Sequence, residues 1–185
     1  GCAGLAGHLP GLLGFCRRSG ESRLPEAEYA VVSGSIHPLA LKQLEMARQA
    51  GFPMRVLSES QKKGLAVFEA PAFRNRLILA AADRPDDLLS LDDPAMRRRI
   101  VHLLGLAASE YVRAGKIAVV IGGDTMRELV AVLGWPDLTP VRELLPGTVL
   151  SQSSDGLYTF ISKSGGFGGP DVLLAIDRLL GGSDS

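Results

Sequence analysis

Nine residues near the C-terminal end, Lys163 to Asp171, include four glycines and have the composition of a ligand-binding loop. Glycine has no Cβ, so such a loop can approach a ligand closely and turn successive backbone N–H groups toward one anion. The helix-like segment Val172 to Leu180 follows, and a helix N-terminus favours phosphate. The alternative is an ordinary helix start, with Pro170 at the first helical position. The spacing fits neither Walker A nor G-x-G-x-x-G, so it leaves both interpretations open.

An earlier segment has the same order of strand, small polar turn and helix. The turn Ser33-Gly34-Ser35 follows the strand-like Glu28 to Val32 and precedes a predicted helix from Pro38 to Gly51. A plain turn and helix cap explain this pattern equally well.

A third junction follows the almost wholly apolar Lys116 to Ile121, a run typical of a strand covered on both faces. Gly122-Gly123-Asp124-Thr125 leads from it into a predicted helix, Met126 to Leu133. The spacing of Thr125 and Glu128 predicts a capping box, so this turn also has an ordinary interpretation. If the three strands are parallel, all three turns face the sheet edge where open α/β sheets bind ligands. Their recurrence favours a phosphorylated ligand.

The remaining pattern predicts an α/β fold, a mainly parallel sheet with helices on both faces and a C-terminal hairpin-like strand pair. We expect that pair at Thr148–Ser151 and Leu157–Ile161, around the turn Ser153 to Gly156. Further strands are predicted at Met54–Leu57 and Arg76–Ala81. The segment Ser58 to Phe73 fits a short strand or a helix.

A long helix is predicted from Ala95 to Ala114, with Arg97-Arg98-Arg99 in its first turns. Three consecutive residues point in different directions around a helix. The arginines are therefore more typical of a solvated helix face than of a phosphate-binding patch.

The composition restricts the class of protein. The chain has 185 residues, 46% of them hydrophobic, and 20 basic residues balance 20 acidic ones. One globular core is expected, and zero net charge argues against a nucleic-acid or anionic-membrane partner. Cys2 and Cys16 form no C-x-x-C, and the three histidines are scattered, so we predict no protein-built metal site. Reduced thiols indicate a cytoplasmic protein.

The segments around the three turns resemble the C-terminal nucleotide-binding domain of four-carbon acid sugar kinases, a family also labelled Hrp-dependent type III effector-like. These enzymes phosphorylate acids such as threonate, erythronate or 3-oxo-tetronate with ATP. The resemblance covers roughly Tyr29 to Leu180. It rests on Val31 to Ser35, Gly122 to Thr125 with Leu133-Gly134, Pro146-Gly147, and Lys163 to Gly168.

The resemblance implies ATP and Mg2+ as cofactors but identifies no catalytic residue. It assigns cofactor binding to Ser35, His37, Gly122, Gly123, Asp124, Thr125, Lys163, Ser164, Gly165, Gly166, Phe167 and Gly168. His37 stands where family members often have a second serine. Asp124 is a candidate to hold Mg2+ through water, because this ion keeps several waters and uses few carboxylates.

Gly1 to Ala6 is similar to the segment that closes the family's N-terminal, substrate-binding domain, and the sequence has no initiating methionine. We expect residues 1–27 to be a remnant of that domain and a linker, 28–180 to be the nucleotide-binding domain, and 181–185 to be a tail. The acid sugar would bind mainly to the missing domain, so this chain alone is expected to bind ATP but to be inactive. Homo-oligomers are compatible with this view.

A second function stays open at this point. A non-catalytic module that binds a nucleotide or phosphorylated metabolite would need the same amides and hydroxyls. A Rossmann-type dehydrogenase domain is disfavoured, because the sequence contains no G-x-G-x-x-G.

Overall fold

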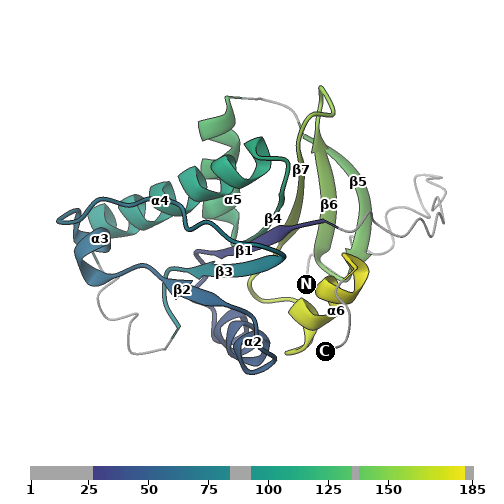
Figure 1. Cartoon of the computed structure of the whole chain (residues 1–185), viewed down its shortest axis with the longest axis horizontal. Helices are drawn as coiled ribbons and strands as arrows, with labels where there is room; N and C mark the ends of the chain where they lie inside the picture. The colour runs from purple at the N-terminus through teal and green to yellow at the C-terminus, as the bar shows by residue number, and fades with distance from the viewer. Residues whose placement is uncertain (1–26, 84–92, 135–137, 182–185) are drawn as a thin grey trace.

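The computed structural model of the chain describes residues 27–83, 93–134 and 138–181. These residues contain a seven-stranded sheet, and its strands lie in the order β2-β3-β1-β4-β7-β6-β5 (Figure 1). The parallel strands are β1 (Tyr29–Ser33), β2 (Met54–Val56), β3 (Arg76–Ala80), β4 (Ile117–Ile121) and β7 (Thr159–Lys163). The antiparallel ones are β5 (Leu138–Leu145) and β6 (Thr148–Ser153). The predicted fold class is confirmed.

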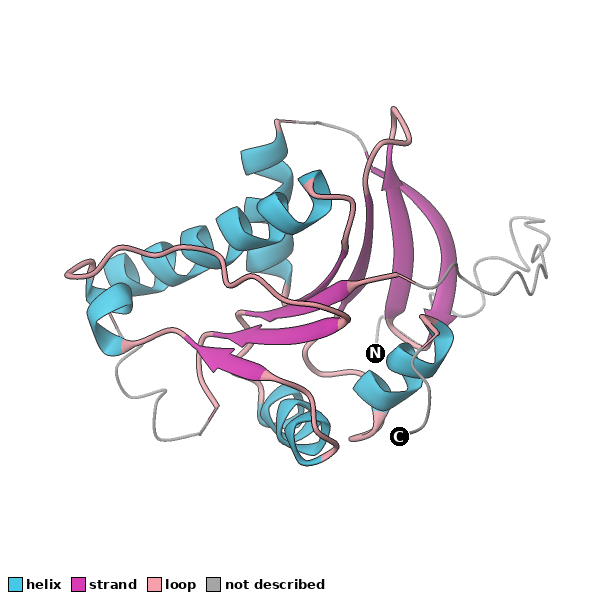
Figure 2. Ribbon diagram, viewed as in Figure 1, coloured by secondary structure: helices cyan, strands magenta, loops and turns pink. Residues whose placement is uncertain are grey.

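Helices cover both faces of the sheet (Figure 2). α2 (Pro38–Gln49) and α6 (Val172–Leu179) pack on one face, and α4 (Pro94–Arg113) and α5 (Gly123–Leu133) pack on the other. Successive strand residues alternate between the faces: Val31 and Val119 pack with α2 and α6, whereas Val32 and Val120 pack with α4 and α5. This double burial explains the continuous apolar runs of β1 and β4.

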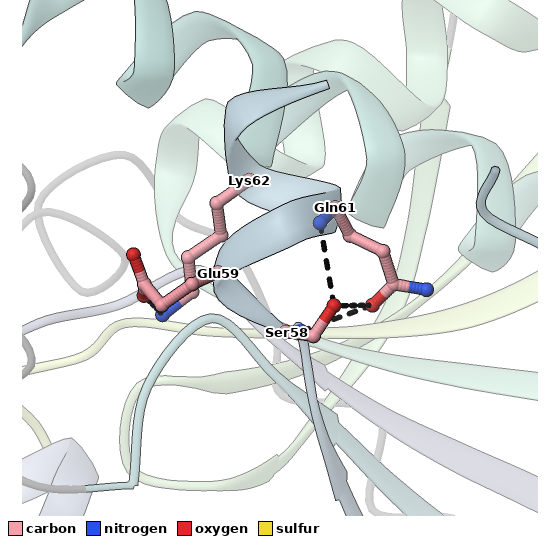
Figure 3. A network of polar contacts seen from close by, with 4 residues as sticks. All are labelled: Ser58, Glu59, Gln61 and Lys62. Atoms are coloured by element: carbon pink, nitrogen blue, oxygen red, sulfur yellow. Dashed lines mark hydrogen bonds and ion pairs between the residues drawn. The ribbon is translucent and has the colours of Figure 1, made fainter. Parts of the chain in front are cut away.

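The segment that the sequence left undecided contains a short helix, α3 (Glu59–Lys63), and no strand among residues 58–73. Its first turn is closed by a capping box, shown in Figure 3. The Ser58 Oγ accepts from the Gln61 N–H at 3.3 Å, and the Gln61 Oε1 accepts from the Ser58 N–H at 3.0 Å. Two N–H groups that a helix start leaves unpaired are thereby satisfied.

The C-terminal part contains one more strand than the sequence predicts. The expected hairpin is present as β6 and β7, but β5 extends the sheet and turns into β6 at Gly147. β5 contains Pro140, Arg142 and Glu143, so its sequence lacks the apolar pattern that predicts a strand. Proline and charged residues are typical of edge strands, and β5 is an edge strand of this sheet. The last helix begins at Val172, as predicted, and Pro170 precedes it instead of occupying its first position.

Residues 1–26 and 182–185 lie outside the described part of the chain, so the expected division into remnant, domain and tail stays a prediction. No helix among the described residues is long and apolar enough to cross a membrane.

Candidate functional site

A cavity of about 460 Å³ lies where the turns after β1, β4 and β7 meet. The end of β3 and one side of α4 complete its wall. Its lining residues are Gly34, Ser35, Ile36, His37, Ala81, Arg97, Ile100, Val101, Gly122, Gly123, Asp124, Thr125, Gly165 and Gly166. Eight of the twelve residues assigned from the sequence are among them. The structure therefore brings the three turns to one site at the carboxyl ends of the parallel strands.

The turns touch one another, and glycine makes the contacts possible. A methyl group on Gly34 would lie 2.2 Å from the Thr125 Oγ1, and one on Gly165 would lie 2.2 Å from the Ser35 Oγ. Real side chains do not approach so closely. The Gly122 N–H also donates to the Lys163 carbonyl at 3.2 Å, which continues the sheet ladder into the turns. The three turns thus hold one another in place.

The N-terminus of α5 opens on this cavity without a side-chain cap. The helix begins at Gly123, three residues earlier than expected, and Gly122 precedes it with a φ of 109°, a conformation that favours glycine. The predicted capping box is wrong, because Thr125 lies inside the first turn with its hydroxyl against Gly34. Glu128 instead contacts the His102 Nδ1 at 2.8 Å. Uncapped first-turn N–H groups favour an anion.

His37 is the N-cap of α2 and also faces the glycine loop, the segment from Lys163 to Asp171 between β7 and α6. Its Nδ1 accepts from the Leu39 N–H at 3.2 Å. In a neutral imidazole the proton then resides on Nε2, which becomes a donor. A methyl group on Gly166 would lie 3.5 Å from that Nε2, so the donor is beside the loop. His37 therefore presents an imidazole N–H to the loop that carries Gly166.

Four of the assigned residues do not line the cavity: Lys163, Ser164, Phe167 and Gly168. Lys163 is 3% exposed, and its Nζ donates to the Ser164 carbonyl at 2.8 Å. Burial lowers the pKa of Lys163 to about 8. Phe167 packs against Gly147. Of the assigned residues from Lys163 to Gly168, only Gly165 and Gly166 line the cavity.

Gln43 of α2 holds the loop that follows β7, a role that the sequence did not reveal. Its side chain is fully buried, and its Nε2 lies 3.0, 3.4 and 2.9 Å from the carbonyl oxygens of Phe167, Gly168 and Gly169. The only signal was a polar residue beside Leu44 on the apolar side of the helix, and nothing in the sequence links that position to a loop more than a hundred residues away.

Arg97 of α4 adds a positive charge to the wall of the cavity. The sequence grouped it with Arg98 and Arg99 as a solvated helix face. The structure separates the three, since Arg98 and Arg99 line a different hollow. A signal was present: Arg97 and Val101 are one turn apart and share a helix face, which Ile100 adjoins.

Asp124 is the carboxylate in the first turn of α5 and, of the residues that the structure describes, the one acidic residue in the cavity wall. No group of three or more histidine, cysteine, aspartate or glutamate residues gathers anywhere in the described residues. A cation in this cavity would therefore depend on Asp124, water and its ligand for coordination.

Residues 30–173 match the family model of a nucleotide-binding C-terminal domain. No curated protein matches the chain in sequence. Among solved structures, the chain resembles a Haemophilus influenzae protein of the family DUF1537, with 18% identity, a TM-score of 0.73, and coverage of 96% of this chain and 46% of that one. It also resembles a DUF1537 protein of Bordetella bronchiseptica, a domain-swapped dimer with bound citrate.

The Bordetella match has 24% identity and a TM-score of 0.62, and it covers 83% of this chain and 41% of that one. At such identities the likeness is one of fold. The chain spans less than half the length of either structure.

Proposed function

Because this chain belongs to the family of nucleotide-binding C-terminal domains, we propose that its cavity binds ATP as the nucleotide half of a four-carbon acid sugar kinase. The acid would be of the threonate, erythronate or 3-oxo-tetronate type. The observation that carries the proposal is the uncapped N-terminus of α5, which opens on a cavity built from three glycine-containing turns. Free helix amides and glycine turns are a recurrent arrangement for phosphate groups.

The residues present fit a nucleotide phosphate chain and Mg2+. The amides of Gly123 and Asp124 would bind phosphate oxygens, and Gly165 and Gly166 leave room for close approach. Arg97, which lines the same cavity, would offset phosphate charge. The Asp124 carboxylate would hold Mg2+ through water, and bound ATP would supply the phosphoryl group. Phosphoryl transfer depends mainly on such positioning and charge neutralisation.

We place the acid sugar and the base for its hydroxyl on a part of the protein outside this chain. The support is that the chain spans 41% and 46% of the two similar structures. The citrate of the Bordetella structure is a small carboxylic acid, as the proposed substrates are. The domain-swapped dimer there supports a homo-oligomer. On this proposal the isolated chain binds ATP but transfers little phosphate.

Calorimetric titration with a non-hydrolysable ATP analogue and Mg2+ tests the proposal. The parent should bind, and Arg97→Gln should bind about ten-fold more weakly, since it loses a charge-assisted contact. Gly166→Val should abolish binding by filling the cavity, while its Cβ stays in ordinary contact with His37. Arg55→Gln, at an exposed residue of the edge strand β2, is the charge-matched control.

No binding by a folded parent, or equal binding by Arg97→Gln and the parent, would contradict the placement of the nucleotide. Equal, Mg2+-independent affinity for ADP and simple phosphate esters would instead indicate a non-catalytic binding module. Appreciable acid sugar kinase activity of the isolated chain would refute the proposal that the acid sugar and the base lie outside this chain.

A further inference from the structure

A second hollow lies on the other side of the N-terminal half of α4, between that helix and α3. Its volume is about 580 Å³, and it shares no lining residue with the first cavity. Basic residues dominate its wall: Lys62, Lys63, Arg98, Arg99 and His102. Because the whole chain has zero net charge, this concentration of positive charge is local.

Helical periodicity explains how one helix serves two cavities. Arg97 and Val101 are four residues apart and face the first cavity. Arg98 and His102 have the same spacing, rotated by one residue, and face the second. α3 contributes Lys62 and Lys63 to the wall. A capping box closes the first turn of this helix, beside Glu59 and Lys62 (Figure 3). The hollow is therefore a product of two fixed helices.

Among the described residues, the carboxylates near this hollow are already engaged. Glu59 pairs with the Lys62 Nζ at 3.0 Å, and Glu128 contacts the His102 Nδ1 at 2.8 Å. Asp93, the acidic residue in the wall, accepts from the Ala95 N–H at 2.8 Å as the N-cap of α4.

Three cations of the wall remain without a carboxylate. Lys63, Arg98 and Arg99 form no ion pair with any described residue. The Arg99 guanidinium lies against α3, because a methyl group on Gly64 would come within 2.5 Å of its Cζ. Lys63, Arg98 and Arg99 line the same hollow, and like charges that share one hollow repel one another. A bound anion would remove that repulsion.

We propose that this hollow is an anion site, separate from the nucleotide cavity, for a small molecule that carries at least two oxyanion charges. Phosphate esters and polycarboxylates share this chemistry, and both suit the planar donors of two arginines. The volume is in the range of small-molecule sites. Met96 and Leu103 offer apolar surface for the carbon part of such a ligand.

The test is calorimetric titration with two probes, inorganic phosphate and citrate, in a chloride buffer. Each titration is run with and without a saturating non-hydrolysable ATP analogue and Mg2+. The double variant Arg98→Gln/Arg99→Gln should bind the preferred probe at least about ten-fold more weakly than the parent, with unchanged affinity for the ATP analogue. The tighter probe identifies the preferred oxyanion.

Lys42→Gln/Arg55→Gln removes two exposed positive charges elsewhere and should leave probe binding at the parent level. The proposal is overturned if the parent binds neither probe, if the double variant binds like the parent, or if the ATP analogue displaces the probe. These outcomes do not depend on the nucleotide proposal, because probe binding is also measured without the analogue.

Discussion

The Nε2 of Gln43 lies 2.9 Å from the carbonyl oxygen of Gly169, across the interface between α2 and the glycine loop. The same nitrogen also reaches the carbonyls of Phe167 and Gly168. In a trans peptide the C=O and the following N–H point in opposite directions. The N–H groups of Gly168 and Gly169 are therefore turned away from α2. One buried side chain sets the orientation of the loop.

Gln43→Met should weaken both the fold and the nucleotide site. Methionine has a similar volume but no donor, so three carbonyls lose their partner, at a cost of about 1–3 kcal/mol. The Gln43 Oε1 has no partner among the described residues, so its loss offsets part of that cost. We expect a lower free energy of unfolding in urea and about ten-fold weaker binding of an ATP analogue by calorimetry.

Gln49→Met, in the same helix, is the matched control. Gln49 is exposed, and its Nε2 donates to the Glu45 Oε1 at 2.8 Å. Unfolding and nucleotide affinity should stay close to those of the parent. Normal affinity in a folded Gln43→Met protein would show that Gln43 stabilises the loop without positioning it.

The lowered pKa of Lys163 predicts that the free energy of unfolding rises with pH. Burial lowers its pKa from the ordinary value of 10.5 to about 8 in the folded protein. Between these values the unfolded chain binds more protons than the folded one, so the contribution of Lys163 to the free energy of unfolding increases with pH. This contribution is complete above the unfolded pKa and is lost as the pH falls through about 8.

Lys163→Met removes this titration. Its free energy of unfolding, relative to the parent, should therefore decrease between about pH 7 and pH 10, measured by urea unfolding at each pH. Lys42→Met, at an exposed residue of α2, controls for the loss of one positive charge. A constant difference between Lys163→Met and the parent over this range would contradict the lowered pKa.

The sequence predicted helices and strands correctly where the local sequence pattern and the tertiary packing favour the same element. The apolar run of β4, the proline that starts α2 and the helical pattern of α4 predict elements close to the observed ones. Prediction from the sequence failed where a tertiary contact determines the position of a side chain. Thr125 has the spacing of a capping box, but the approach of Gly34 fixes its hydroxyl elsewhere.

The candidate site was only partly visible in the sequence for a similar reason. Glycine-rich turns after strands identify the three segments that meet, because parallel strands bring such turns to one edge. No local pattern shows which side chains a separate element contributes. Arg97 and Gln43 come from two helices on opposite faces of the sheet, and only the packing of those helices places Arg97 in the cavity wall and Gln43 against the loop after β7.

Gly165 and Ser35 should be energetically coupled through the contact between their turns. A methyl group on Gly165 would lie 2.2 Å from the Ser35 Oγ and 3.2 Å from its Cβ. Gly165→Ala therefore displaces the serine or the loop, and overpacking of this kind costs about 1–3 kcal/mol. We expect lower stability in urea and weaker binding of an ATP analogue.

Ser35→Gly removes both clashing atoms, so the double variant Gly165→Ala/Ser35→Gly should recover much of the stability lost by Gly165→Ala. A double-mutant cycle in urea measures this recovery as a coupling of about 1 kcal/mol or more, a size typical of residues in contact. Gly165→Ala with Gln49→Met provides the uncoupled control, since Gln49 lies in the last turn of α2 and bonds to Glu45. Additive effects of Gly165→Ala and Ser35→Gly would mean that the two turns do not meet in solution as they do in the structure.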